Sequence, residues 1–161
     1  MGQRQSQTNA SLFYAQRLIS IYEKDRDASI LQDQHALLTG AWLCLKESWV
    51  CWLNELSIYM NLERLEGYQV NELELLLETG LPEGQLLLGL IDDSNSWLKV
   101  MLQRILKPAE RLNSNVKPNN SSLELISLVS TDVVDEGQLI LQILSEFKSY
   151  IESVRVRQIE W

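Results

Sequence analysis

The chain has 161 residues, of which 45% are hydrophobic and 22% are charged. At this length a single domain buries about two-thirds of the surface of the unfolded chain, so we expect residues 1–161 to form one domain whose core needs no metal or disulfide. The formal net charge of −8 excludes a protein that binds nucleic acid over its whole surface, because such binding requires an excess of cations.

Residues 8–23 carry the first helical pattern. Apolar side chains recur there at spacings of three and four residues, which places them on one face of an α-helix. They are Leu12, Ala15, Leu18, Ile19 and Tyr22. We expect Thr8 or Asn9 to cap this helix and residues 1–7 to be disordered.

A longer helical pattern covers residues 28–62. Its apolar positions fall within one broad arc of the helix: Leu31, Leu38, Trp42, Leu45, Trp49, Trp52, Leu53, Leu56 and Met60. A membrane-spanning helix requires about 20 mostly apolar residues. Lys46, Glu47, Asn54 and Glu55 interrupt the run here. The pattern therefore predicts a core helix of a bundle, with its tryptophans in the core.

Two shorter helical patterns follow. An acidic helix is predicted at residues 70–79, and the Gly-Leu-Pro-Glu-Gly sequence after it indicates a turn from which a helix restarts near Glu83. Residues 86–91 are a candidate for a second short piece.

Residues 94–111 form the next helical pattern, which we expect Pro108 to kink or end. Its apolar face consists of Leu98, Met101, Leu102 and Ile105.

The remainder combines a loop, an extended segment and a final helix. Residues 112–121 are polar and predict a flexible loop, and residues 123–134 predict an extended strap. Residues 135–158 predict a helix with a heptad-like stripe. The stripe consists of Ile140, Leu144, Phe147, Ile151 and Val154. The expected fold is all-α: an antiparallel bundle of three long helices plus shorter helices, with one extended strap before the C-terminal helix.

Catalytic and metal-binding motifs are absent from the sequence. There is no glycine-rich phosphate loop, no G-x-S-x-G motif and no pair of Glu-x-x-His motifs. Cys44 and Cys51 would lie about 10 Å apart along a helix, too far for a disulfide. An enzyme that uses a histidine would depend on His35, the sole histidine, for which we expect a structural place at the margin of the core. No enzymatic activity, cofactor or metal is expected.

Charge is distributed unevenly in the middle of the chain. Residues 64–93 carry one Arg and seven carboxylates, whereas residues 94–118 carry five cations and one carboxylate. The simplest interpretation is that these neighbouring segments neutralise each other, and the alternative is that the basic helix is free to bind a partner.

The candidate partner-binding residues are Trp97, Lys99, Arg104, Lys107 and Arg111. Trp97 and Trp161 lie outside the long apolar runs, so both are candidates for exposed contact residues. The favoured function is a non-enzymatic interaction or regulatory module that binds a protein partner or a second copy of itself. The alternative is a nucleic-acid-associated protein whose basic helix, residues 97–111, contacts phosphates.

No membrane partner is expected. The first 17 residues lack the apolar run of a secretory signal, so we expect a cytoplasmic protein.

Three stretches carry a resemblance to a known group of proteins. They are "TNASLFYAQRLI" at residues 8–19, "SWLKVML" at residues 96–102 and "VRVRQIEW" at residues 154–161, together with the Leu/Trp-rich second helix. With these features the chain resembles a family of uncharacterised small helical gammaproteobacterial proteins, a domain of unknown function. The resemblance implies a bacterial helical protein and supplies no active-site residues.

Overall fold

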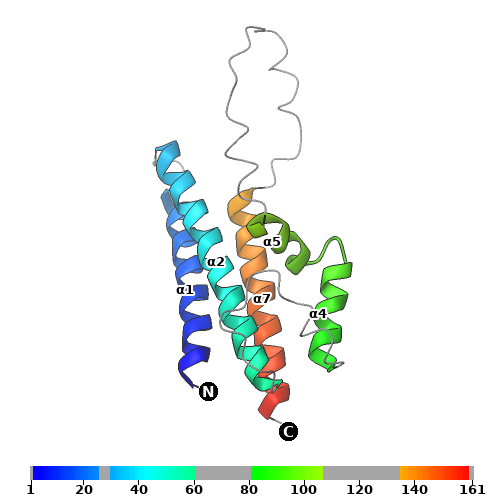
Figure 1. Cartoon of the computed structure of the whole chain (residues 1–161). Helices are drawn as coiled ribbons and strands as arrows, with labels where there is room; N and C mark the ends of the chain where they lie inside the picture. The colour runs from blue at the N-terminus through cyan, green and yellow to red at the C-terminus, as the bar shows by residue number, and fades with distance from the viewer. Residues whose placement is uncertain (1, 26–29, 61–80, 107–134, 160–161) are drawn as a thin grey trace.

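The computed structural model describes residues 2–25, 30–60, 81–106 and 135–159, and it is helical throughout these ranges apart from short caps and turns. The helices are α1 (Gly2–Asp25), α2 (Leu31–Tyr59), α4 (Pro82–Asp92), α5 (Trp97–Leu106) and α7 (Glu136–Ile159) (Figure 1). The predicted all-α bundle is confirmed. The predicted helix at 70–79, loop at 112–121 and strap at 123–134 lie outside the described residues.

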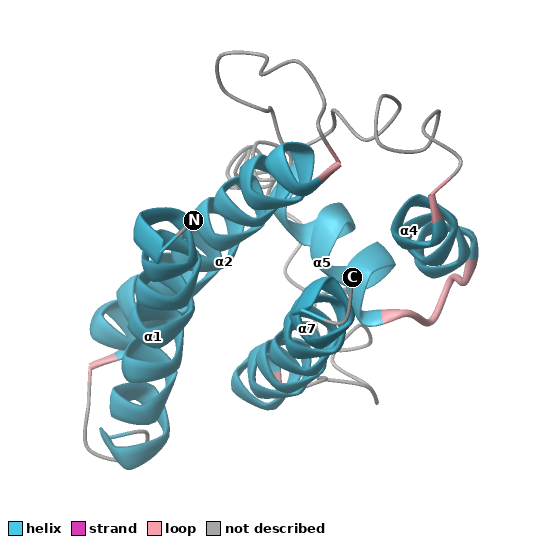
Figure 2. Cartoon of the chain, turned by 90° about the horizontal axis from the view of Figure 1, so that it is seen from below, coloured by secondary structure: helices cyan, strands magenta, loops and turns pink. Residues whose placement is uncertain are grey.

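The three long helices α1, α2 and α7 lie side by side (Figures 1 and 2). Helix α1 runs antiparallel to α7, because Asn9 near its start contacts Arg155 while Gln16, further along, contacts Lys148. Helix α1 also packs extensively on α2, which runs back in the opposite direction. Helices α2 and α7 therefore run parallel to each other, so the chain between them must cross from one end of the bundle to the other.

The core fills the space between the long helices. All five residues of the predicted stripe on α7 are buried, as are Trp49 and Trp52 of α2. Trp49 packs against Phe147 with ring centroids 5.8 Å apart, and Trp52 packs edge-on against Tyr150 at 5.9 Å. The four predicted apolar residues of α5 are also buried, so helical periodicity identified the buried faces of α5 and α7 correctly.

The N-terminal boundary of α1 differs from the prediction. The helix begins at Gly2, so residues 2–7, expected to be disordered, are helical. Thr8 is not a cap but a fully buried residue inside α1, and its hydroxyl donates a hydrogen bond to Glu55 of α2 at 3.1 Å. A threonine side chain that bonds a neighbouring helix does not cap the N–H groups of its own helix.

The two short helices also differ in their boundaries. Residues 82–92 form one helix rather than two pieces, with Pro82 in its first turn, where its missing N–H and fixed φ suit a helix start. Helix α5 begins at Trp97 because Ser96 caps it: the Ser96 hydroxyl accepts a hydrogen bond from the Lys99 N–H at 3.0 Å.

The short helices complete one side of the bundle. Helix α5 packs on α7 and α2, and α4 packs on α5. Seen from below, α1 and α4 therefore lie at opposite edges of the molecule (Figure 2). The outer surface of α1 is left without a covering helix among the described residues.

Candidate interaction surface

Trp97, predicted to be an exposed contact residue, is buried. Its ring is 6% exposed and stacks on Phe147, with centroids 5.0 Å apart and an angle of 22° between the planes. Tyr150 lies on the same ring at 5.8 Å. The exposure prediction was wrong because Trp97 starts a short helix that crosses α7, so its apolar surroundings come from another helix rather than from its own sequence neighbours.

The basic residues of α5 are only partly available to bind a partner. Arg104 forms an ion pair with Glu136 of α7, with 3.3 Å between Nη1 and Oε1. The same Glu136 oxygen accepts a hydrogen bond from the indole N–H of Trp42 at 3.0 Å. Lys99 is partly exposed. The charge of Arg104 is therefore compensated by Glu136 of α7, while residues 64–80 of the acidic segment that we expected to neutralise the basic helix lie outside the described residues.

Lys107, Arg111 and Trp161 lie outside the described residues. Of the five residues predicted to form the partner-binding surface, the structure describes three: Trp97 is buried, Arg104 is paired with Glu136, and Lys99 is partly exposed. The described part of α5 therefore contributes one available cation to that surface.

A buried polar cluster joins the three long helices near both ends of the chain. Glu55 of α2 accepts hydrogen bonds from Arg155 Nε at 2.7 Å, from Arg155 Nη2 at 2.8 Å and from the Thr8 hydroxyl at 3.1 Å. Arg155 Nη1 also donates to Asn9 at 2.9 Å, and its guanidinium lies 5.6 Å from the centre of the Trp52 ring. We call these residues the clasp, because they connect α1, α2 and α7.

Both cysteines of the chain lie on α2. The thiols of Cys44 and Cys51 are free. Burial, and after it the negative charge of Glu47, raises the pKa of both thiols, that of Cys51 to about 11. Both cysteines are therefore neutral and weakly nucleophilic at pH 7. Among the described residues no group of three or more His, Cys, Asp and Glu side chains could hold a metal ion.

His35 lies away from the core margin where we expected it. The imidazole is exposed, as is Leu31, which was predicted to be within the apolar arc of α2. Helix α7 begins at Glu136, which contacts Trp42, about two turns further along α2 than His35. The first turns of α2 thus extend past the start of the helix that would have covered them.

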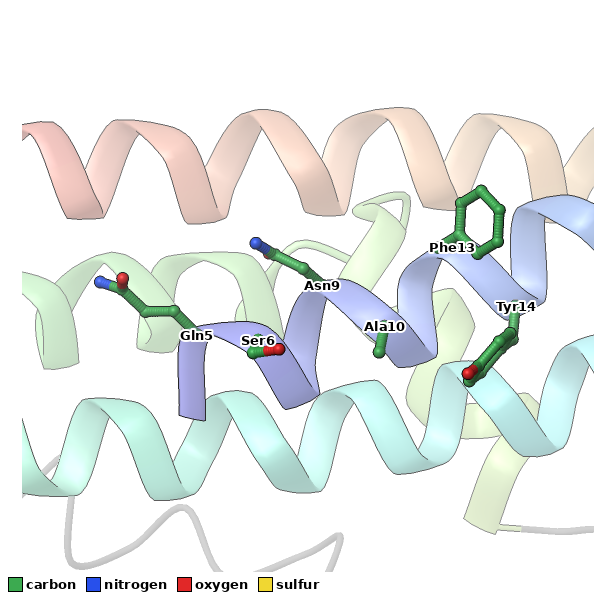
Figure 3. Close-up of a pocket in the computed structure, with 6 residues that line it drawn as sticks. All are labelled: Gln5, Ser6, Asn9, Ala10, Phe13 and Tyr14. Atoms are coloured by element: carbon green, nitrogen blue, oxygen red, sulfur yellow. The ribbon is translucent and has the colours of Figure 1, made fainter. Parts of the chain in front are cut away.

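The outer side of α1 carries a shallow hollow (Figure 3). We call its lining the α1 outer face; it consists of Gln5, Ser6, Asn9, Ala10, Phe13 and Tyr14. Figure 3 shows Phe13 directed toward the α7 side and Tyr14 toward the α2 side, with Ala10 nearer the N-terminus of α1. The two rings meet edge to face with centroids 6.1 Å apart.

The two aromatic residues of this face differ from the rest in exposure. Phe13 is 62% exposed and Tyr14 is 58% exposed. Of the ten aromatic side chains whose burial the structure describes, these are the only two that are exposed. Large aromatic side chains in water are a feature of binding surfaces, where they become contact residues once a partner covers them.

Sequence periodicity contained a signal for this face that we did not use. The buried residues Leu12, Ala15 and Ile19 define the core side of α1, and successive residues rotate by about 100° around a helix. Phe13 and Tyr14 therefore fall on the side away from the stripe. An aromatic pair on the polar side of an amphipathic helix was the available indication.

Comparisons with known proteins give the family but not a function. Over residues 1–161 the chain matches a family of unknown function, DUF6586, and it belongs to that family. No curated protein and no solved structure matches the chain. Within the described residues, no helix is long and apolar enough to cross a membrane.

Proposed function

We propose that the protein is a non-enzymatic interaction module that binds a protein partner through the α1 outer face. The observation that carries this proposal is the exposure of Phe13 and Tyr14, at 62% and 58%, beside the small residue Ala10. Exposed aromatic rings beside a shallow pocket can bury a large apolar area against a partner. The cost in side-chain entropy is small, because each ring has only two side-chain torsions.

The rest of the molecule favours a binding role over catalysis. The single histidine is exposed on the first turns of α2, and both thiols have raised pKa values. A nucleophilic thiol requires the opposite shift, a lowered pKa that yields the thiolate near pH 7.

A cytoplasmic location in a bacterium is part of the proposal. Two free cysteines suit a reducing compartment, where thiols are kept from forming disulfides.

Nucleic-acid binding through residues 97–111 is the alternative. It would need several free cations on one face, and the structure describes Lys99 as partly open while Arg104 is engaged by Glu136. For this reason we favour a protein partner.

The test is a pull-down from native lysate with the tagged protein, with and without nuclease. The variants are Phe13→Ala/Tyr14→Ala and, as a matched control, Leu43→Ala, which removes an α2 side chain that is 61% exposed. We expect a nuclease-resistant protein partner that the double variant loses and Leu43→Ala retains.

Two outcomes would contradict the proposal. A partner retained by the double variant would place the binding surface elsewhere. A capture that nuclease abolishes, and that is lost in Lys99→Glu/Lys107→Glu, would support the nucleic-acid alternative.

A further inference from the structure

The exposed side of α1 carries positive charge in a chain that is otherwise acidic. Residues 1–22 contain two arginines and no carboxylate, whereas residues 23–161 carry twelve cations and 22 carboxylates. Arg17 is exposed, and it follows Phe13 and Tyr14 by four and three residues, so the three side chains are neighbours on the surface of the helix. One turn beyond its aromatic pair, the α1 outer face therefore ends at a cation.

A second cation reaches the same end of the face from α7. The Lys148 ammonium group donates a hydrogen bond to the side-chain oxygen of Gln16, which is exposed and precedes Arg17 in α1. An amide oxygen has no formal charge, so it does not neutralise the ammonium group. Within the described residues neither cation has a carboxylate partner, because the ion pairs there involve Arg104 and Arg155. We call Arg17 and Lys148 the cationic edge.

We propose that the partner bound by the α1 outer face is an acidic amphipathic segment of another protein. Its apolar side chains cover Phe13 and Tyr14, and its carboxylates contact the cationic edge. This inference rests on the proposed function and states the chemistry of the partner for that same surface. Opposite charges beside an apolar contact orient the partner and raise its rate of association.

The charge of the whole chain favours a short acidic segment over a larger anion. Nucleic acids and anionic membranes present phosphates over a wide area, so they also meet the rest of a molecule whose net charge is −8. A peptide segment extends little beyond the α1 outer face. Repulsion from charges further than about 8 Å is largely screened at physiological ionic strength. A segment of this size therefore gains the attraction of the cationic edge and escapes most of the repulsion.

A neighbouring carboxylate gives the contact a direction. Glu152 is exposed on α7, one turn beyond Lys148. Because α7 runs antiparallel to α1, Glu152 lies toward the N-terminal half of α1. A carboxylate of the partner is repelled there and attracted at the cationic edge. We therefore expect the acidic residues of the partner to lie beside Arg17, with its apolar residues over Phe13 and Tyr14.

The experiment is fluorescence anisotropy with a labelled helical peptide of about 20 residues that has leucines on one side and glutamates on the other. A second peptide, with lysine in place of each glutamate, tests the sign of the charge. Each probe is titrated with the purified full chain up to about 500 μM, at low and at high salt. Labelled oligothymidylate and labelled vesicles of equal parts phosphatidylcholine and phosphatidylglycerol are titrated in the same way.

Three variants accompany the wild type: Arg17→Glu, Phe13→Ala/Tyr14→Ala and the control Lys99→Glu. Arg17→Glu and Lys99→Glu change the net charge of the protein equally, but Lys99 lies on α5, which packs on α7 and α2. Glutamate is a good helix former, so both charge reversals keep the helical propensity. Circular dichroism verifies that each variant is folded.

We expect the wild type to bind the acidic peptide at least about tenfold more tightly than the basic peptide, and high salt to weaken that binding. Arg17→Glu should weaken it by at least about fivefold and Lys99→Glu by less than about twofold, because only Arg17 lies beside the peptide. Phe13→Ala/Tyr14→Ala should weaken it as well, through the loss of apolar contact.

Three results would overturn the inference. The first is an acidic peptide that does not bind, or that binds no more tightly than the basic peptide. The second is an equal effect of Arg17→Glu and Lys99→Glu, which would mean that only the net charge matters. The third is tighter binding of oligothymidylate or of the vesicles than of the acidic peptide, lost in Arg17→Glu, which would assign the surface to a nucleic acid or to a membrane.

Failure of this inference is separable from failure of the proposed function. A lysate partner that is lost in Phe13→Ala/Tyr14→Ala but fully retained by Arg17→Glu refutes the acidic segment and supports the surface. A lysate partner that is indifferent to both variants refutes the two together.

Discussion

The clasp predicts that removal of Arg155 destabilises the protein severely. The Glu55 side chain is only 9% exposed and that of Arg155 is 18% exposed. In Arg155→Met the carboxylate loses the two short hydrogen bonds from the guanidinium, at 2.7 and 2.8 Å, and remains buried with its charge uncompensated. Leaving one partner of a buried ion pair alone costs about 3–5 kcal/mol.

A double variant separates the ion pair from the packing. Glu55→Leu/Arg155→Met removes both charges and the desolvation that each requires, so we expect it to recover at least half of the loss seen in Arg155→Met. Arg157→Met is the matched control, because the Arg157 Nε donates a hydrogen bond at 3.1 Å to the Ser153 carbonyl of its own helix rather than to another helix. We expect that control to cost under about 1 kcal/mol.

The measurement is urea unfolding at pH 7, followed by tryptophan fluorescence, with free energies of unfolding from linear extrapolation. The reasoning is refuted if Arg155→Met costs less than about 1 kcal/mol, or if Arg157→Met costs as much as Arg155→Met. Either result would mean that the three helices are held together without the clasp.

Three further predictions concern packing and ionisation. Trp49→Ala should lower the free energy of unfolding by about 3–5 kcal/mol, because Trp49 is fully buried; a loss under about 1 kcal/mol would contradict its core position. Gly137→Ala should destabilise the protein, because an added Cβ would lie 2.6 Å from the buried Tyr22 ring. Gly89→Ala is the control: an added Cβ there meets nothing within 4 Å, so the substitution should stabilise the helix by about 0.5–1 kcal/mol. If calorimetry gave both changes in stability the same sign, the close approach of α7 to α1 would be refuted. The rate at which iodoacetamide alkylates Cys51 should rise with pH to a midpoint near pH 11, and Glu47→Gln should lower that midpoint. Because the pKa of the thiol in the folded state is raised above the ordinary 9.0, its contribution to stability is present below pH 9 and is lost as the pH rises toward 11.

Helical periodicity predicted most of the fold. The stripe on α7 and the apolar face of α5 were predicted correctly because each residue lies on the side of its own helix that faces the rest of the bundle. Such burial repeats every three to four residues, so the sequence alone displays it.

The features that were missed depend on contacts between helices. The first turns of α1 are polar and have no periodic signal, yet the helix starts at Gly2 and Thr8 bonds Glu55 across 47 residues of sequence. Trp97 is buried by Phe147 and Tyr150 of α7, which are about 50 residues away in the chain. Sequence spacing within one helix carries no information on such partners.

The interaction surface was missed for a related reason. The excess of cations in residues 94–118 suggested a binding surface at residues 97–111, but Glu136 of α7 compensates the charge of Arg104. The aromatic pair on α1 could be seen in the sequence. Its exposure could not, because it follows from the position of α1 at the edge of the described helices, with none of them covering that side.

Hydroxyl-radical footprinting tests the central claim, that the α1 outer face is a binding surface, whatever its occupant. The tagged protein is oxidised at about 1 μM in buffer and after capture from lysate, and the modification of Phe13 and Tyr14 is compared with that of Leu43. We predict protection of the aromatic pair in the captured complex, with Leu43 unchanged. Phe13 and Tyr14 that react equally in both samples would contradict the account.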